Sequence, residues 1–175
     1  MSTKQFFSGD MLYDLYNIAI TPQQNNSQFH MALSDKSFLD EFCTLNIRLP
    51  RQTGHTTASI NFINRIITTG NYDIYYLCYK LNMSILLKQI GYTISGEKIR
   101  DSIDLDVNII THQQFLGYNF PRDFDDFEKN IIIVTDLYFI LRQKKKTIKL
   151  YEQQLLSILK QCREKQLTFM VINLQ

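Results

Sequence analysis

Short apolar runs without polar alternation recur between helical segments along this chain of 175 residues. In the clearest one, residues 130–136, Ile131, Ile132, Ile133 and Val134 follow one another. A strand that is apolar on both sides must be buried on both faces of its sheet. Parallel neighbours also need long crossover connections, which helices supply. The sequence therefore predicts an α/β fold, a mostly parallel sheet flanked by helices. The expected strands lie near residues 44–49, 72–79, 107–111, 130–136 and 167–174.

Helical patterns fill the stretches between these strands. In the longest pattern, Leu155, Ile158 and Leu159 are three and four residues apart, which puts them on one side of a helix. Residues 91–106 are polar, and we expect a loop there with a short strand or turn of its own. The expected helices cover residues 35–44, 56–69, 81–90 and 147–166, with a helical turn within 113–120.

The first 34 residues have a weaker pattern than the rest of the chain. We expect a short helix there, then a polar loop at residues 21–27. Residues 1–34 are therefore expected to form an N-terminal extension. Residues 35–175 have the length of one domain and are expected to form a single domain around one sheet.

Composition narrows the classes of protein that the chain can belong to. Hydrophobic residues make up 45% and charged residues 21%, which is typical of a globular protein. The net charge of +2 is too small for a global field that attracts nucleic acid. Cys43, Cys78 and Cys162 are far apart, so no zinc site or disulfide framework is indicated. No apolar run approaches the roughly 18 residues that span a bilayer. We expect a cytoplasmic protein without a membrane partner.

The segment LPRQTGHTT, residues 49–57, joins the first expected strand to the helix after it. Against the phosphate-loop pattern G-x-x-x-x-G-K-[ST], Gly54 and Thr56 match, while Leu49 replaces the first glycine and His55 the lysine. In such a loop, backbone N–H groups at the helix start bind phosphate oxygens, and the Ser/Thr hydroxyl binds Mg²⁺. The alternative is a purely structural turn, because strand, turn and helix start also occur without a ligand.

The same segment resembles the deviant phosphate loop of the viral large terminase subunits, the ATPases that package DNA. Their pattern is Arg-Gln-x-Gly-Lys-[Ser/Thr], which Arg51, Gln52, Gly54 and Thr56 match without a gap. The resemblance implies a RecA-like P-loop NTPase domain in a viral protein of the host-cell interior, with ATP and Mg²⁺ as cofactors. The residues that it assigns to the nucleotide are Arg51, Gln52, Thr53, Gly54, His55, Thr56 and Thr57.

Three later segments resemble parts of the same family. Residues 131–136 resemble a Walker B strand, whose closing aspartate, here Asp136, holds Mg²⁺ through water. Residues 75–84 resemble the strand-to-helix turn after the phosphate-loop helix in helicases and terminases. Residues 109–117 resemble the segment of superfamily 2 helicases in which a strand ends in Thr and a polar pair before it contacts a nucleic-acid backbone. Each match is unspecific by itself, but all of them appear in the family's order. The metal ligands that the resemblance implies are Thr56 and Asp136.

Two departures from the family indicate slow or absent hydrolysis. His55 lacks the permanent charge of the usual lysine, and losing such a charge typically costs about 10²-fold or more in rate. Leu137 follows Asp136, where the family has a glutamate that polarises water. Arg51 can substitute for the missing charge, because its guanidinium suits a phosphate. We therefore expect nucleotide binding with slow or no hydrolysis.

Two other functions stay open from the sequence. One is a non-enzymatic interaction or regulatory protein that kept the P-loop scaffold and no longer binds nucleotide. The other is a true, weak ATPase in which Arg51 acts together with a water-activating His112 or Gln113. Because there is no room for the family's nuclease or for a second RecA-like domain, we expect the chain to work with a protein assembly partner.

One basic cluster stands out against the small net charge. Several cationic side chains so close together can bind nucleic-acid phosphates with strong salt dependence. A solvated helix start is the alternative explanation of such a run. The cluster consists of Arg142, Lys144, Lys145, Lys146 and Lys149.

Overall fold

A five-stranded parallel sheet forms the centre of the chain. The computed structural model describes residues 8–25, 33–48, 55–69, 71–78, 90, 107–117, 128–135 and 143–174. The order of the strands in the sheet is β1-β5-β4-β2-β3, and all neighbours are parallel. This confirms the expected α/β fold. The strands are β1 (Thr44–Ile47), β2 (Tyr72–Cys78), β3 (Val107–Thr111), β4 (Asn130–Thr135) and β5 (Phe169–Leu174).

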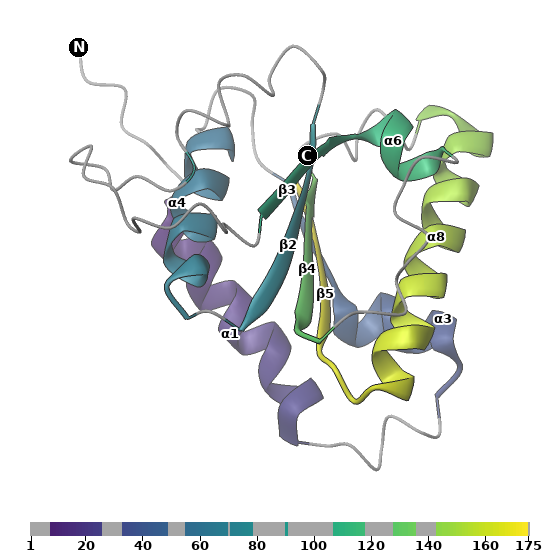
Figure 1. Cartoon of the computed structure of the whole chain (residues 1–175), viewed down its shortest axis with the longest axis horizontal. Helices are drawn as coiled ribbons and strands as arrows, with labels where there is room; N and C mark the ends of the chain where they lie inside the picture. The colour runs from purple at the N-terminus through teal and green to yellow at the C-terminus, as the bar shows by residue number, and fades with distance from the viewer. Residues whose placement is uncertain are drawn as a thin grey trace.

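Helices cover both faces of this sheet (Figure 1). On one face lie α1 (Gly9–Asn25) and α4 (His55–Ile67). On the other lie α3 (Asp35–Phe38), α6 (His112–Leu116) and α8 (Lys145–Glu164). A π-helical turn, η1 (Leu39–Cys43), leads from α3 into β1.

The direction of the crossovers explains why helices lie on both faces. The connection from β1 through α4 to β2 and the connection from β4 through α8 to β5 cross the sheet in opposite directions. Right-handed crossovers that run in opposite directions place their helices on opposite faces. Since all strands are parallel, their carboxyl ends share one edge of the sheet, and α4, α6 and α8 all follow from that edge.

Two apolar cores hold the layers together, one on each face of the sheet. Along β4, Ile132 and Val134 pack into the core under α1 and α4, and Ile131 and Ile133 into the core under α8. All residues of β5 are buried as well. Burying one such side chain stabilises the fold by about 1.5–3 kcal/mol. The unbroken apolar runs of the sequence thus form strands that are buried on both faces.

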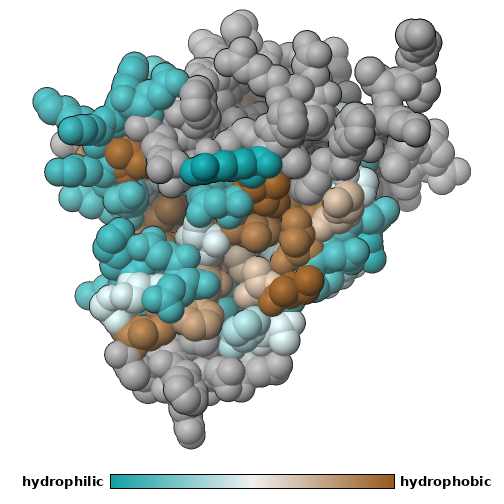
Figure 2. Space-filling model, turned by 180° about the vertical axis from the view of Figure 1, so that it is seen from behind, coloured by the Kyte–Doolittle hydropathy of each residue, from teal (hydrophilic) through white to brown (hydrophobic). Residues whose placement is uncertain are grey.

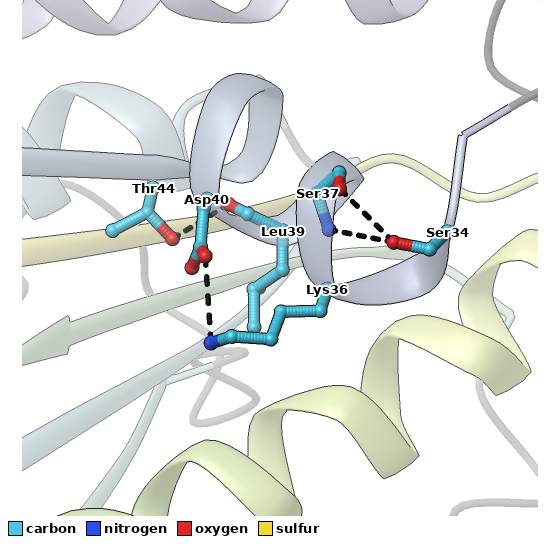
Figure 3. A network of polar contacts seen from close by, with 6 residues as sticks. All are labelled: Ser34, Lys36, Ser37, Leu39, Asp40 and Thr44. Atoms are coloured by element: carbon cyan, nitrogen blue, oxygen red, sulfur yellow. Dashed lines mark hydrogen bonds and ion pairs between the residues drawn. The ribbon is translucent and has the colours of Figure 1, made fainter.

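Short-range polar contacts fix the segment before β1 (Figure 3). The Ser34 hydroxyl caps α3 by accepting a hydrogen bond from the Ser37 N–H at 3.2 Å. The Thr44 hydroxyl donates to the Leu39 carbonyl at 2.8 Å, which satisfies an oxygen at the end of the helical segment. The helix expected over residues 35–44 therefore ends one residue earlier, with a π-helical turn, and Thr44 already belongs to β1.

The expected loop at residues 21–27 is wrong for its described part, because α1 continues to Asn25. The Gln23 side chain donates to the Phe42 carbonyl of η1 at 2.6 Å and holds the last turn in place. The other end of α1 touches α4 so closely that a Cβ on Gly9 would lie 2.5 Å from the Asn61 Cβ. Leu12 and Tyr16 thereby reach the same core as α4.

The boundary between α8 and β5 also differs from the expected one. α8 covers Lys145–Glu164 instead of residues 147–166, and β5 begins at Phe169 instead of residue 167. Gln166 has a φ of 57°, the left-handed conformation that ends a helix. The Leu167 N–H then donates back to the Cys162 carbonyl at 2.8 Å. The sequence has no glycine at this point, so the usual indication of a helix end is missing.

Other expectations fall partly or wholly outside the described residues. The expected helix at 81–90 is described only at Ile90, and the expected loop at 91–106 lies outside altogether. The helical turn expected within 113–120 is α6, which begins one residue earlier and ends at Leu116. None of the helices that the structure describes is long and apolar enough to cross a membrane.

Candidate functional site

The expected nucleotide residues are described only in part. α4 begins at His55, directly after Gly54, so the helix starts where the phosphate-loop pattern requires it. Thr56 is half-buried and Thr57 exposed in its first turn. Outside the described residues lie Arg51, Gln52, Thr53, Gly54 and Asp136, and also the side chain of His55.

The start of α4 is able to bind an anion. The helix has 13 residues and no acidic residue in its first turn. The first N–H groups of a helix have no partner within it, and the aligned peptide dipoles make this end positive. Thr56 adds a hydroxyl to the same turn. Phosphate oxygens suit this combination of donors.

The strand order puts a second strand end close to this helix start. β4 ends two positions from β1, with β5 between them. At about 4.8 Å per strand, the two carboxyl ends lie about 10 Å apart. The chain leaves β1 toward one face of the sheet and β4 toward the other, so this is a topological switch point. Ligands of open parallel sheets bind in the crevice outside such a point. Thr135 is the last residue of β4, directly before Asp136.

A row of polar side chains crosses the sheet just below this crevice. Asn46 of β1, Asn173 of β5 and Thr135 of β4 are aligned in register. The Asn173 amide donates to the Asn46 side-chain oxygen at 2.9 Å. The Tyr151 hydroxyl of α8 in turn donates to the Asn173 side-chain oxygen at 3.0 Å. A chain of hydrogen bonds, buried at Tyr151 and Asn173 and exposed at Asn46, therefore connects α8 to β1.

This chain of hydrogen bonds is costly to disturb. Asn173 and Tyr151 are each only 1% exposed, and Thr135 is completely buried. A buried polar atom that loses its partner costs about 1–3 kcal/mol. No sequence pattern indicated that Asn46 or Tyr151 takes part in this chain of hydrogen bonds. The available signal was a single amide near the end of an otherwise apolar strand, which needs a buried partner.

A second polar group lies at the start of α6. His112 follows β3, and the Thr111 hydroxyl and the Gln114 side chain cap this helix reciprocally. Burial lowers the pKa of His112, and the positive charge of Lys144 lowers it further. The imidazole is therefore neutral at pH 7. Phe115 of α6 packs on Tyr151 of α8 with 5.7 Å between the ring centroids.

His112 does not lie at the end of β1. Three strands, β5, β4 and β2, separate β3 from β1. The carboxyl ends of β1 and β3 are therefore about 19 Å apart along the sheet. His112 and Gln113 follow β3 directly, far from the start of α4. This geometry argues against the expectation that either residue activates water at residues 51–57.

The described part of the chain brings no group of histidine, cysteine or acidic side chains together that could hold a metal ion. Thr56 is described, but its expected partner Asp136 is not. The cysteines Cys43, Cys78 and Cys162 are buried and form no disulfide with a described residue. Burial raises the pKa of Cys162 to about 12, which keeps this thiol protonated and unreactive.

Comparison with protein-family models, with curated proteins and with solved structures finds no match for this chain.

Tyr151→Phe removes a single hydroxyl from the buried chain of hydrogen bonds. We expect the free energy of unfolding to fall by about 1–3 kcal/mol, because the side-chain oxygen of Asn173 loses its donor. Urea denaturation measures the change. Tyr13→Phe is the control, since Tyr13 is half-buried on α1 and should change stability by less than about 0.5 kcal/mol. Equal stabilities of Tyr151→Phe and wild type would contradict the account.

Lys144→Gln should raise the pKa of His112 toward 6.5, because it removes the neighbouring positive charge. NMR titration of the imidazole measures this pKa, with Lys145→Gln as the control that leaves it unchanged. A lowered pKa in the folded state means that the unfolded chain binds more protons just below pH 6.5. The wild type therefore loses stability as the pH falls through this window, and Lys144→Gln loses less. An unchanged pKa in Lys144→Gln would show that the two groups do not interact.

Proposed function

We propose that this chain binds ATP with Mg²⁺ at the carboxyl edge of the sheet, between the ends of β1 and β4, and hydrolyses it slowly or not at all. The observation that carries the proposal is the start of α4 at His55, directly after the residues that match the phosphate-loop pattern. The N–H groups of this first turn would hold the phosphates, with Thr56 directed to Mg²⁺.

The distance between the strand ends supports this assignment. A nucleotide with Mg²⁺ needs a phosphate site and a carboxylate that can reach the metal through water. The ends of β1 and β4 are about 10 Å apart, and Asp136 follows β4 directly. Asn173 lies on the strand between them and fixes β1 through Asn46. The phosphate-loop segment and Asp136 thus follow two strand ends that are close enough to serve one such ligand.

The order of the elements supports a RecA-like, terminase- or helicase-like domain. The described parts of the four segments lie in the first turn of α4, in β2, in β3 and α6, and in β4. The three strands among these elements end at the same edge of the sheet, since all strands are parallel. A viral protein of DNA packaging is the function that the resemblance favours. Its closest rival is a regulatory protein on the same scaffold that binds no nucleotide.

Slow hydrolysis follows from the residues that replace the catalytic ones. His55 stands in place of the lysine, and Leu137 in place of the water-polarising glutamate. His112 and Gln113 follow β3, about 19 Å along the sheet edge from the end of β1. Without the lysine of the family and its water-polarising glutamate, we expect ATP to be bound but hydrolysed slowly or not at all.

The start of α8 supports nucleic acid as a second ligand. Lys144, Lys145, Lys146 and Lys149 are exposed, and none makes an ion pair with a described carboxylate. Lysines at the positive end of a helix oppose its dipole, and α8 has no acidic residue in its first turn. Such an arrangement costs stability unless an anion is bound. A phosphate backbone supplies that anion. Arg142, expected in the same cluster, lies outside the described residues.

Calorimetry with ATP and Mg²⁺ on the wild type, Thr56→Ala and His55→Lys tests the nucleotide site. We expect the wild type to bind and Thr56→Ala to bind at least about tenfold more weakly, since the metal loses a ligand. His55→Lys should bind more tightly and gain phosphate release. Thr68→Ala, at the other end of α4, is the matched control and should bind like the wild type. No binding by any of these variants, with Thr56→Ala folded, would leave the regulatory scaffold as the function.

Titration of a single-stranded oligonucleotide at several salt concentrations tests the lysine surface. The affinity should fall with rising salt, by about 0.7 in log K per log unit of salt for each phosphate contact. Exchanging Lys145, Lys146 and Lys149 for Gln should flatten this slope. Exchanging Lys160 and Lys165 for Gln, near the far end of α8, should change it less. An affinity independent of salt, or equal slopes for both sets, would remove nucleic acid as a ligand.

A further inference from the structure

β1 lies at an edge of the sheet and has one open side. It pairs with β5 along Thr44–Ile47, and no other strand of the described residues pairs with it. The N–H and C=O groups of an open strand edge are a template for pairing with another chain. Proteins protect such edges or use them to associate.

A stripe of exposed apolar side chains runs along α1. Met11, Leu15 and Ile18 are 50%, 38% and 72% exposed. They are four and three residues apart, which places them on one side of the helix. The opposite side, with Leu12, Tyr16 and Ile20, is buried in the core. α1 is therefore apolar on two sides, although a helix at the surface of a single domain needs only one.

The exposed stripe and the open edge belong to the same side of the molecule. The last turn of α1 is bonded to η1, the turn that leads directly into β1. Leu45 of β1 packs into the core that α1 covers. α4 lies on the other side of α1, where Arg65 pairs with Asp10 at 2.8 Å. Figure 2, seen from behind, shows apolar residues gathered at the centre of the view between hydrophilic ones.

We propose that the outer edge of β1 and the stripe on α1 form the interface of a symmetric dimer of this chain. Two copies of β1 pair as antiparallel strands around a two-fold axis that is perpendicular to the sheet. This symmetry keeps the same face of the sheet upward in both copies. The two α1 helices then run antiparallel on the same side of the joined sheet, with their apolar stripes toward each other. The same patch is used by both copies, as in most homodimers.

The charges that flank β1 indicate that a second copy of this chain binds at its outer edge. Glu41 precedes β1 and Arg48 follows it, and both are exposed. Neither makes an ion pair with another described residue. Antiparallel pairing centred on Leu45 keeps matching faces together and brings Arg48 of one copy opposite Phe42 of the other, next to Glu41. Because of the two-fold symmetry, the contact between Arg48 and Glu41 occurs twice in the dimer. A parallel arrangement would instead place Arg48 against Arg48.

The dimer does not rest on nucleotide binding. Antiparallel pairing directs the carboxyl edges of the two joined sheets in opposite directions, and it uses the side of β1 rather than its end. The proposed interface therefore includes neither the start of α4 nor the end of β4. If the chain binds no nucleotide, the proposed dimer is unaffected. If the chain is a monomer, the proposed nucleotide site is unaffected.

Sedimentation velocity over a range of protein concentrations tests the interface. We expect the wild type to sediment as a dimer and Ile18→Glu as a monomer, with a dissociation constant raised at least about tenfold by the buried, unpaired carboxylate. Leu150→Glu is the matched control, because Leu150 is 51% exposed on α8, on the other face of the sheet. It should remain a dimer. A wild type that is monomeric up to its solubility limit, or equal dissociation by Leu150→Glu, would overturn the proposal.

Charge exchange tests the antiparallel pairing of β1 itself. Glu41→Arg and Arg48→Glu should each weaken the dimer, because each places like charges together. The double variant should restore it, since the opposite charges meet again with their places exchanged. A dimer that neither single variant weakens, or one that the double variant does not restore, would overturn pairing through β1. Circular dichroism confirms that each variant is folded.

Discussion

Burial of the central strands on both faces is the constraint on which the rest of the structure depends. β4 and β5 have almost no polar side chains to offer water, so each needs a layer of helices on either side. Parallel pairing meets this need, because the crossovers that join parallel strands place helices on the faces of the sheet. Parallel strands then gather their carboxyl ends at one edge. Asn46, Thr135 and Asn173, which are far apart in the sequence, meet at that edge for this reason.

The fold class could be predicted from the sequence because apolar periodicity reports burial directly. Strand positions near 72–79, 107–111 and 130–136 agree with β2, β3 and β4 within the described residues. The continuation of α1 to Asn25 could not be predicted, because its last turn depends on the contact between Gln23 and η1. No local sequence pattern indicates that α8 ends before Gln166, which has a left-handed conformation. Tertiary contacts decide both boundaries, and sequence patterns do not contain them.

Only the part of the candidate site at the start of α4 could be predicted from the sequence. The apolar pattern predicted a helix from Thr56, one residue after α4 begins, because a loop between a strand and a helix has a recognisable pattern. The chain of hydrogen bonds from Tyr151 through Asn173 to Asn46 depends on the order of the strands. β5, the last strand in sequence, enters the sheet beside β1, the first. No local pattern reveals such a neighbour. The same order separates His112 from the start of α4, although the sequence alone allowed the two to be close.

β1 takes part in both the proposed nucleotide site and the proposed dimer interface. Its carboxyl end leads toward α4 and the crevice, and its open side faces the second copy in the proposed dimer. The amide of Asn173 holds it from the inner side. The position of β1 is therefore fixed from its inner side, by pairing with β5 and by the bond between Asn46 and Asn173. Association and ligand binding can use the same strand without competing for its atoms.

NMR titration of the isotope-labelled protein with ATP and Mg²⁺ tests most directly whether the crevice between β1 and β4 binds a nucleotide. The account predicts the largest backbone amide shifts in the first turn of α4, at Thr56 and Thr57, with smaller shifts at the ends of β1 and β5. Shifts confined to the lysines at the start of α8 would place the phosphates elsewhere and contradict it. So would a spectrum that does not change at saturating ATP.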